Sequence, residues 1–406
     1  MAIRPRCLWQ KPFSIGVTIA SLACSAPNDE SPNQGSPHAG DAGSESGASS
    51  AGAMSAGTSA IASPSLGGAG AAGTPSGNLP AAGSLSVGGE AAGGGGMAQT
   101  GGLAGSGMLG DPGTDGDGDF QITKYPPDPA LSPGKSPAGK RFNFNHTGSK
   151  LYPATASRAI TVYVPAKYQD GTPAPVMVVM DGAGSQFLRV QAGLDNLSQS
   201  TDPTRRVPAF ILVAVANGQR SIELDTMSDL WARYIDEEVF AAVVSNPAIR
   251  AAYPNIAITK DPEGRGAVGC SSGGSAAIIM SWFRPDLFRR VIGYDASLVN
   301  LQSSAMYPLG AWDLHSGLRL IQNSAVKPLR IMFNDNEMDN GAGTGEAGAK
   351  DWLLAGQRTA AALKTKGYHY RWLEGMGAKH CSDARVQETS MGDSLVWVWR
   401  GYPVGP

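Results

Sequence analysis

Residues 269–274 read Gly-Cys-Ser-Ser-Gly-Gly, between a short apolar run at 265–269 and the helical stretch SAAIIMSWF at 275–283. A Gly-x-Ser-x-Gly turn between strand and helix is typical of a nucleophilic serine in strained backbone, whose neighbours two residues away must lack side chains. The N-terminus of the following helix favours developing negative charge. We therefore predict Ser271 as a nucleophile. Ser272 is the rival, but the spacing to Gly269 favours Ser271.

Strands and helices are expected to alternate around this turn. Runs that are apolar along their whole length are typical of strands covered on both faces, and they occur at 159–164, 175–180, 209–216, 265–269, 290–294, 329–333 and 368–373. Helical patterns lie between them, at 228–244, 274–283, 347–366 and 393–399. The alternation predicts an α/β fold with a mostly parallel central sheet and helices on both faces. In such sheets, ligands bind beyond the carboxyl ends of the strands.

Residues 25–118 have a different composition from the rest. They hold 26 of the 54 glycines and contain no aromatic residue, Lys or Arg. Such a stretch cannot bury enough apolar surface to offset the entropy of ordering it, so we predict a disordered Gly/Ala/Ser-rich stalk. Its end, DPGTDGDGD at 111–119, lacks the distal Glu of a calcium loop and is read as a solvated acidic hinge. The folded domain is expected at 119–406.

The first 24 residues have the features of an export signal. Three basic residues precede the apolar run 13–23, and Cys24 follows it. The segment resembles a bacterial lipoprotein signal, in which the Cys carries the lipid. We expect an exported protein that is lipid-anchored at the cell envelope through Cys24. An ordinary cleaved signal, giving a secreted or periplasmic protein, is the alternative.

The charge and the known motifs narrow the class of function. With 32 Lys and Arg against 34 Asp and Glu, the chain has no basic excess, which argues against a nucleic-acid partner. There is no H-E-x-x-H, C-x-x-C or P-loop pattern, and the G-x-G-x-x-G match at 343–348 does not directly follow a strand. We therefore expect no metal and no cofactor, and membrane contact only through the lipid anchor.

A serine nucleophile needs a base, and the base needs a carboxylate. His380 lies after the last predicted strand, where an α/β-hydrolase places its histidine. The loop NDNEMDN at 334–340 supplies three competing carboxylates, Asp335, Glu337 and Asp339. Asp295, which follows another strand, is read as a turn residue.

Two cysteines flank the predicted catalytic pair. Cys270 precedes Ser271, and Cys381 follows His380. Because the serine and histidine must approach within about 2.6–3.2 Å, their neighbours come within the reach of a disulfide. We predict a Cys270–Cys381 disulfide, which an oxidising compartment would allow. Two buried free thiols are the alternative.

Residues 119–406 resemble the esterase family of α/β-hydrolases that includes esterase D-like enzymes, enterochelin esterases, feruloyl and acetyl xylan esterases and mycolyltransferases. The similarity lies in the strand into Asp181-Gly182, GQRSIELDTMSDLWARYIDEE (218–238), ITKDPEGRGAVGCSSGG (258–274), RPDLF (284–288) and WVWRGYP (397–403). The resemblance implies an α/β-hydrolase fold. It also implies Glu337 as the acid, with Asp335 and Asp339 as runners-up, and an oxyanion hole formed by the amides of Ala183 and Ser272.

The resemblance further implies a serine carboxylic-ester hydrolase that acts through an acyl-enzyme. Its expected substrate is a small-molecule or polysaccharide-linked ester, with feruloyl, acetyl, short acyl and siderophore esters all open. A mycolyltransferase-type acyltransferase and a catalytically silent surface-binding module are the alternatives. Arg220, Glu223 and Asp225, in the family-like stretch, are read as a structural ion pair rather than as pocket residues.

Overall fold

The computed structural model describes residues 116–404. The expected signal, Cys24 and the stalk as far as residue 115 lie outside the described residues. Residues 116–118 differ from the expectation, because they belong to the folded body. Asp117 lies 2.8 Å from His369 Nδ1, and Asp119 accepts a hydrogen bond of 2.8 Å from the Tyr370 hydroxyl. This end of the acidic stretch is therefore bound to the body rather than a solvated hinge.

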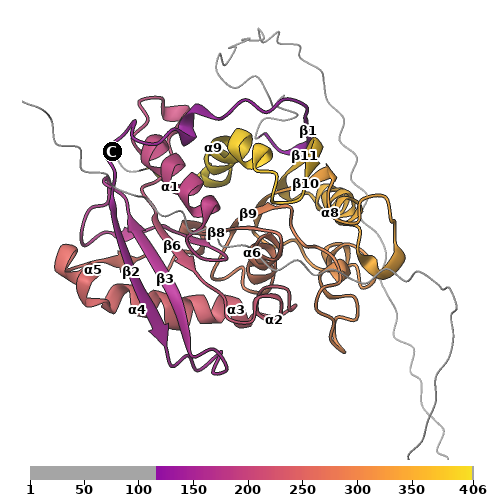
Figure 1. Ribbon diagram of the computed structural model, residues 1–406, viewed down its shortest axis with the longest axis horizontal. Helices are drawn as coiled ribbons and strands as arrows, with labels where there is room; N and C mark the ends of the chain where they lie inside the picture. Colours follow the sequence, from indigo (N-terminus) through magenta and orange to yellow (C-terminus); the bar gives the residue numbers. More distant parts are fainter. Residues whose placement is uncertain (1–115, 405–406) are drawn as a thin grey trace, which may run out of the picture. The chain divides into compact units, whose positions relative to one another are not determined.

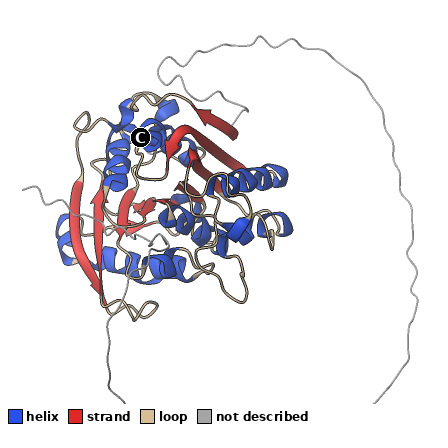
Figure 2. Ribbon diagram, turned by 45° about the vertical axis from the view of Figure 1, so that its right-hand side comes forward, coloured by secondary structure: helices blue, strands red, loops and turns tan. Residues whose placement is uncertain are grey.

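Within residues 116–404, nine strands form one sheet (Figures 1 and 2). Its order is β1 (Gly118–Ile122), β11 (His369–Lys379), β10 (Arg330–Met338), β9 (Arg290–Tyr294), β8 (Arg265–Cys270), β5 (Val176–Val179), β6 (Ile211–Val215), β3 (Ser157–Val164) and β2 (Lys140–Thr147). Only β3 runs against the others. A separate pair joins β4 (Pro173–Ala174) to β7 (Ala257–Ile258). The expected mostly parallel sheet is confirmed.

Helices pack on both faces because the strands are apolar on both faces. In β5, Val176 and Val178 belong to one buried cluster, whereas Met177 and Val179 belong to the other. The second cluster includes side chains of α1 (Ser185–Ser198) and α9 (Arg385–Trp399), which lie together in Figure 1.

The opposite cluster contains the other main helices. These are α3 (Leu230–Arg233), a π-helical segment (Tyr234–Val239), α4 (Phe240–Ser245), α6 (Ser272–Phe283) and α8 (Trp352–Lys366). The shorter helices are α2 (Arg220–Leu224), α5 (Pro247–Ala252) and α7 (Leu320–Asn323). None of the helices in the described part of the chain is long and apolar enough to cross a membrane. The carboxyl ends of β8, β9, β10 and β11 meet at one edge of the sheet and carry the candidate site.

Candidate active site

The turn between β8 and α6 holds Ser271 in a backbone conformation that side chains rarely adopt. Its φ is 58° and its ψ is −126°, and its amide donates to the Tyr294 carbonyl at 2.9 Å. A Cβ on Gly269 would lie 2.0 Å from the Gly273 carbonyl oxygen, so only glycine fits there. The Gly-x-Ser-x-Gly spacing is therefore a steric requirement of this turn.

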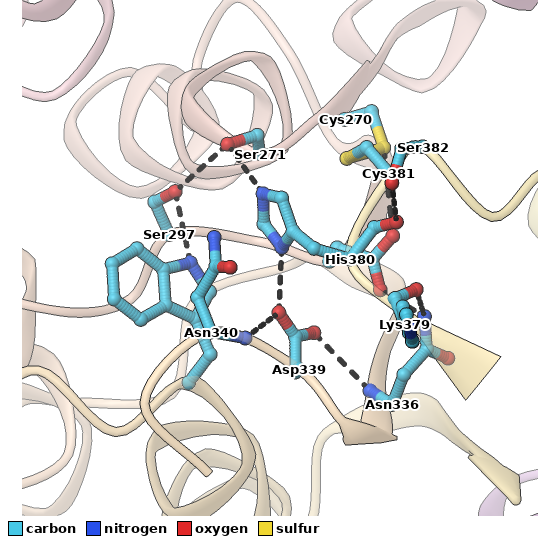
Figure 3. A network of polar contacts seen from close by, with 12 residues as sticks. Cys270, Ser271, Ser297, Asn336, Asp339, Asn340, Lys379, His380, Cys381 and Ser382 are labelled. Atoms are coloured by element: carbon cyan, nitrogen blue, oxygen red, sulfur yellow. Dashed lines mark hydrogen bonds and ion pairs between the residues drawn. A yellow bond between two sulfur atoms is a disulfide. The ribbon is translucent and has the colours of Figure 1, made fainter. Parts of the chain in front are cut away.

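His380 lies between Ser271 and a carboxylate (Figure 3). Its Nε2 is 2.9 Å from Ser271 Oγ, and its Nδ1 is 2.5 Å from Asp339 Oδ1. The Asp339 side chain is fully buried, whereas that of His380 is 19% exposed. A buried carboxylate only accepts hydrogen bonds, so Nδ1 carries the proton and Nε2 is free to accept from the Ser271 hydroxyl.

The prediction of Glu337 as the partner of His380 is wrong. Glu337 Oε2 accepts instead from the Gly377 amide at 2.7 Å, in an exposed position. Asp335 is buried, and its Oδ2 accepts from Trp372 Nε1 at 3.2 Å. The pairing of β10 with β11 shifts register between Asn336 and Met338. The three carboxylates therefore do not follow one regular strand, and only Asp339 faces the histidine.

Backbone amides hold the Asp339 carboxylate in place. Oδ1 accepts from the Asn340 amide at 2.7 Å, and Oδ2 accepts from the Asn336 amide at 3.2 Å. The side chain of Asn336 also donates to the Lys379 carbonyl at 2.6 Å, one residue before His380. Asn336 thus ties the loop of the carboxylate to the loop of the histidine.

Asp295 is more than the turn residue that was expected. It is buried, has a φ of 42°, and its Oδ1 accepts from Asn336 Nδ2 at 2.7 Å. An oxygen of Asp295, an oxygen of Asp339 and a nitrogen of His380 lie within 4.8 Å of one another. Burial, followed by the charge of Asp339, raises the pKa of Asp295 well above its usual range. The negative charge of Asp339 and the buried position thus both favour the protonated form of Asp295.

The expected disulfide is confirmed. Cys270 and Cys381 are joined, with a Cα–Cα distance of 6.2 Å and a sequence separation of 111 residues (Figure 3). The bond connects the residue before Ser271 to the residue after His380. Two groups of metal-ligand type occur among the described residues, Cys270 with Asp295 and Cys381, and Asp295 with Asp339 and His380. The first holds no free thiolate, and in the second His380 is hydrogen-bonded to Asp339.

Arg220 lies beside the turn that is expected to supply an oxyanion amide. Its Nε and Nη2 donate to the two oxygens of Asp181 at 2.7 and 2.9 Å, and its Nη1 donates to Ser272 Oγ at 2.9 Å. The hydrogen bonds that Arg220 donates to Asp181 raise the pKa of Arg220. The Arg220 side chain is 46% exposed. It therefore pairs with Asp181 at the site itself, and not with Glu223 or Asp225 as the expected ion pair would require.

Glu223 and Asp225 have structural partners, as expected of them. Glu223 forms a buried ion pair of 2.6 Å with Arg158 and accepts from the Gly218 amide at 2.8 Å. Asp225 accepts from Ser275 Oγ at 2.8 Å, inside the first turn of α6. These contacts hold the short helix α2, which begins at Arg220.

A sequence model of the family described as "Putative esterase" matches residues 155–375, more than half of the chain. The chain belongs to this esterase family. It is a carboxylic ester hydrolase. No protein among the curated sequences matches it.

Several solved structures are similar to this esterase. A ferulic acid esterase has 17% identity and a TM-score of 0.46, over 65% of this chain and 99% of that one. The ferulic acid esterase from Anaeromyces mucronatus has 14% identity and a TM-score of 0.46, over 68% and 96%. The enterobactin esterase from Shigella flexneri has 15% identity and a TM-score of 0.48, over 69% and 64%. The esterase thus spans less than two thirds of that last protein.

One residue that contacts Ser271 was not predicted from the sequence. Ser297 Oγ lies 3.4 Å from Ser271 Oγ and accepts from Trp352 Nε1 at 3.1 Å. No motif marks a lone serine in a loop. The only available signal was that Ser297 follows β9, whose carboxyl end lies next to that of β8.

Proposed function

We propose that the esterase is a serine hydrolase that works through an acyl-enzyme, with Ser271 as nucleophile, His380 as base and Asp339 as acid. The observation that carries this proposal is the position of His380, 2.9 Å from the serine hydroxyl and 2.5 Å from the carboxylate. A hydroxyl is a weak nucleophile at neutral pH and needs such a base. The carboxylate fixes the imidazole tautomer and stabilises the imidazolium that forms.

In acylation, an electron pair of Ser271 Oγ forms a bond to the ester carbonyl carbon, while the hydroxyl proton passes to His380 Nε2. The carbonyl π pair moves to its oxygen and gives a tetrahedral intermediate. This intermediate collapses, the bond to the leaving alkoxide breaks, and the alkoxide takes the proton from His380. Water then repeats the sequence on the acyl-enzyme, and the carboxylic acid and free Ser271 result.

For the oxyanion we propose the amides of Ala183 and Ser272. Asp181 and Gly182, which precede Ala183, both have a positive φ of 62° and 78°. The Gly182 amide is bound to the Val215 carbonyl at 3.0 Å, which anchors this turn to β6. Each donor to such an oxyanion is worth about 100-fold to 1,000-fold in rate.

As substrate we propose a small-molecule or polysaccharide-linked ester. Esters of ferulic acid and enterobactin, after which the similar structures are named, are the first compounds to test, together with acetyl and short-chain p-nitrophenyl esters. A sugar acceptor added to the same assay measures acyl transfer. If the acyl group is found on the sugar and not as free acid, the reaction is an acyl transfer of the mycolyltransferase type and not a hydrolysis.

Labelling with a fluorophosphonate probe tests the nucleophile. Ser271→Ala is expected to abolish both labelling and ester hydrolysis. Ser272→Ala is the matched control, because Ser272 is the neighbouring hydroxyl, and it is expected to keep the label. Labelling that survives in Ser271→Ala and disappears in Ser272→Ala would overturn the assignment.

We also propose that the protein is exported and anchored through a lipid on Cys24, which rests on the sequence of residues 1–24 alone. Fractionation of cells that express the full chain tests this. The parent is expected in the membrane fraction, and Cys24→Ala is expected to leave it. Equal membrane content of the two proteins would contradict the anchor.

A further inference from the structure

Ser297 is bound to the nucleophile residue twice. Its amide donates to the Ser271 carbonyl at 3.2 Å, and its hydroxyl oxygen lies 3.4 Å from Ser271 Oγ (Figure 3). The Ser297 side chain is buried. On its other side, the Trp352 indole approaches the same hydroxyl oxygen at 3.1 Å. These contacts place the Ser297 hydroxyl beside Ser271 Oγ. The Ser297 hydroxyl reaches that oxygen directly and not through the His380 ring.

Only one assignment of donors and acceptors satisfies all of these contacts. The indole Nε1 is a donor only, so Ser297 Oγ accepts from Trp352. The single proton of the Ser271 hydroxyl is committed to His380 Nε2, because Nδ1 already donates to Asp339. The contact between the two hydroxyls must therefore run from Ser297 to Ser271. In the described part of the chain, no other hydrogen bond competes for the Ser297 proton.

We propose that Ser297 is a further catalytic residue of the esterase, whose hydroxyl donates a hydrogen bond to Ser271 Oγ and stabilises the negative charge that develops on that atom. The inference rests on the proposed function, because it assumes that Ser271 is the nucleophile. It adds a donor that acts on the serine oxygen, whereas the oxyanion amides act on the oxygen of the substrate carbonyl.

The same donor serves both halves of the reaction. In acylation, Ser271 Oγ gains negative charge as its proton moves to His380 and its electron pair forms the bond to carbon. In deacylation, the bond between the acyl carbon and Oγ breaks, the electron pair returns to Oγ, and His380 returns the proton. A hydrogen bond of 3.4 Å is long at rest, and such contacts often shorten when charge develops.

Trp352 is a positioning residue in this arrangement. It is the first residue of α8, whose N-cap Asp351 accepts from the Leu354 amide, and its own amide donates to the Asn340 carbonyl at 3.2 Å. Its ring meets the His380 ring edge-on, with 6.0 Å between centroids. The indole N–H fixes the orientation of the Ser297 hydroxyl and, because hydrogen bonds in a chain polarise one another, strengthens its donation.

A double-mutant cycle tests the proposal on the full-length protein with a p-nitrophenyl ester. Ser297→Ala removes the donor, Trp352→Phe removes the indole N–H but keeps an aromatic ring, and the double variant combines them. Ser281→Ala and Trp399→Phe are matched controls. The Ser281 hydroxyl and the Trp399 Nε1 are also buried, and they have no hydrogen-bond partner among residues 116–404.

We expect Ser297→Ala to lower kcat by about 10-fold to 50-fold, less than the loss of an oxyanion-hole donor, with KM changed by less than about twofold. The loss should appear in the burst phase and in the steady state, because both steps use the donor. Trp352→Phe should cost about threefold to fivefold, and should cost nothing further in the Ser297→Ala background. Ser297→Cys, a near-isosteric weak donor, should fall between the parent and Ser297→Ala.

Unchanged kcat in a folded Ser297→Ala protein would overturn the proposal, as would fully additive losses in the double variant. An equal loss in the Ser281→Ala control would do the same, since it would show a general effect of core substitution. Fluorophosphonate labelling of Ser271→Ala separates this outcome from a failure of the proposed function, because that label reports on the nucleophile whatever Ser297 contributes.

Discussion

Arg220 binds Asp181 through two parallel hydrogen bonds, from Nε to Oδ1 at 2.7 Å and from Nη2 to Oδ2 at 2.9 Å. The remaining nitrogen, Nη1, donates to the Ser272 hydroxyl at 2.9 Å. One guanidinium thus joins the turn after β5 to the start of α6. These two segments carry the amides of Ala183 and Ser272, which we propose as the oxyanion hole. We predict that this bridge sets the distance between the two amides.

Replacement of Arg220 by Gln is expected to lower kcat by about 10-fold to 100-fold, because the two amides lose their common support; this is less than the complete loss of one donor, which costs about 100-fold to 1,000-fold. Arg220→Lys should recover only part of the loss, since an ammonium cannot bind the carboxylate in the bidentate form. Steady-state kinetics measure kcat, and thermal unfolding measures the stability of each variant. Arg233→Gln, in an exposed pair with Glu237, is the control. A kcat within twofold of the parent in Arg220→Gln would contradict the role of the bridge.

Asp339 and Glu337 are two residues apart and should differ sharply in their effect on kcat. Asp339→Asn is expected to lower kcat by about 10,000-fold, since the imidazole loses the carboxylate that sets its tautomer. Glu337→Gln should stay within about twofold, because among residues 116–404 the exposed Glu337 carboxylate accepts a hydrogen bond from the Gly377 amide and none from His380. Initial rates on a p-nitrophenyl ester compare the two variants. A larger loss of kcat in Glu337→Gln than in Asp339→Asn would contradict the assignment of Asp339 and would favour Glu337 as the acid.

Asp335 is expected to make stability depend on pH. Burial raises the pKa of Asp335 well above its usual range, so the folded state keeps a proton that the unfolded state releases above about pH 4. The folded state binds more protons, and the free energy of unfolding therefore falls as the pH rises from about 4 through the folded-state pKa. Asp335→Asn removes this term, and its stability should fall less between about pH 5 and pH 9.

Urea unfolding at several pH values measures that slope. Asp286→Asn is the control, because the hydrogen bond from Arg284 lowers the pKa of Asp286. Its contribution is complete above about pH 4, so the substitution should shift stability equally at pH 5 and pH 9. The kcat of Asp335→Asn should stay close to that of the parent. An unchanged slope in Asp335→Asn would show that Asp335 is ionised in the folded state.

The Cys270–Cys381 bond should stabilise the fold more than it speeds the reaction. It closes a loop of 111 residues, so the double Ser variant is expected to lose about 2–4 kcal/mol of unfolding free energy. The hydrogen bonds of His380 to Ser271 and Asp339 remain, so kcat should fall by less than about tenfold. Urea unfolding of the parent with and without reductant provides the comparison. A loss below about 0.5 kcal/mol would mean that the surrounding contacts hold both loops without the bond.

Much of the sheet could be predicted from the sequence because its central strands are apolar along their whole length. The run at 290–294 matches β9 at both ends. The edge strands were missed because their signal differs. β2 alternates exposed and half-buried side chains around Phe142 and Phe144, and β1 is a short strand that begins in the Gly-rich stretch at Gly118. Helix α1 was also missed, since its buried residues, such as Phe187 and Leu194, are spaced among polar ones.

The geometry around His380 could be predicted only as far as local spacing determines it. The tight turn at Ser271 follows from the glycine spacing, and the disulfide follows from the closeness of the serine and histidine. The choice among Asp335, Glu337 and Asp339 depends on the register shift between β10 and β11. No residue type in the loop predicts that shift. Ser297 and Asp295 come from a loop whose contacts arise only when β9 lies between β8 and β10.

The positive φ of Ser271 puts the stability of the fold and the proposed catalytic activity in conflict at one residue. A side chain in that conformation costs about 1–3 kcal/mol, which glycine would largely avoid. A Ser271→Gly protein should therefore be more robust than the natural one and entirely inactive. A directed-evolution experiment that selects only for proteins that stay folded at high temperature would favour Ser271→Gly. Ester hydrolysis therefore has to be measured in every round.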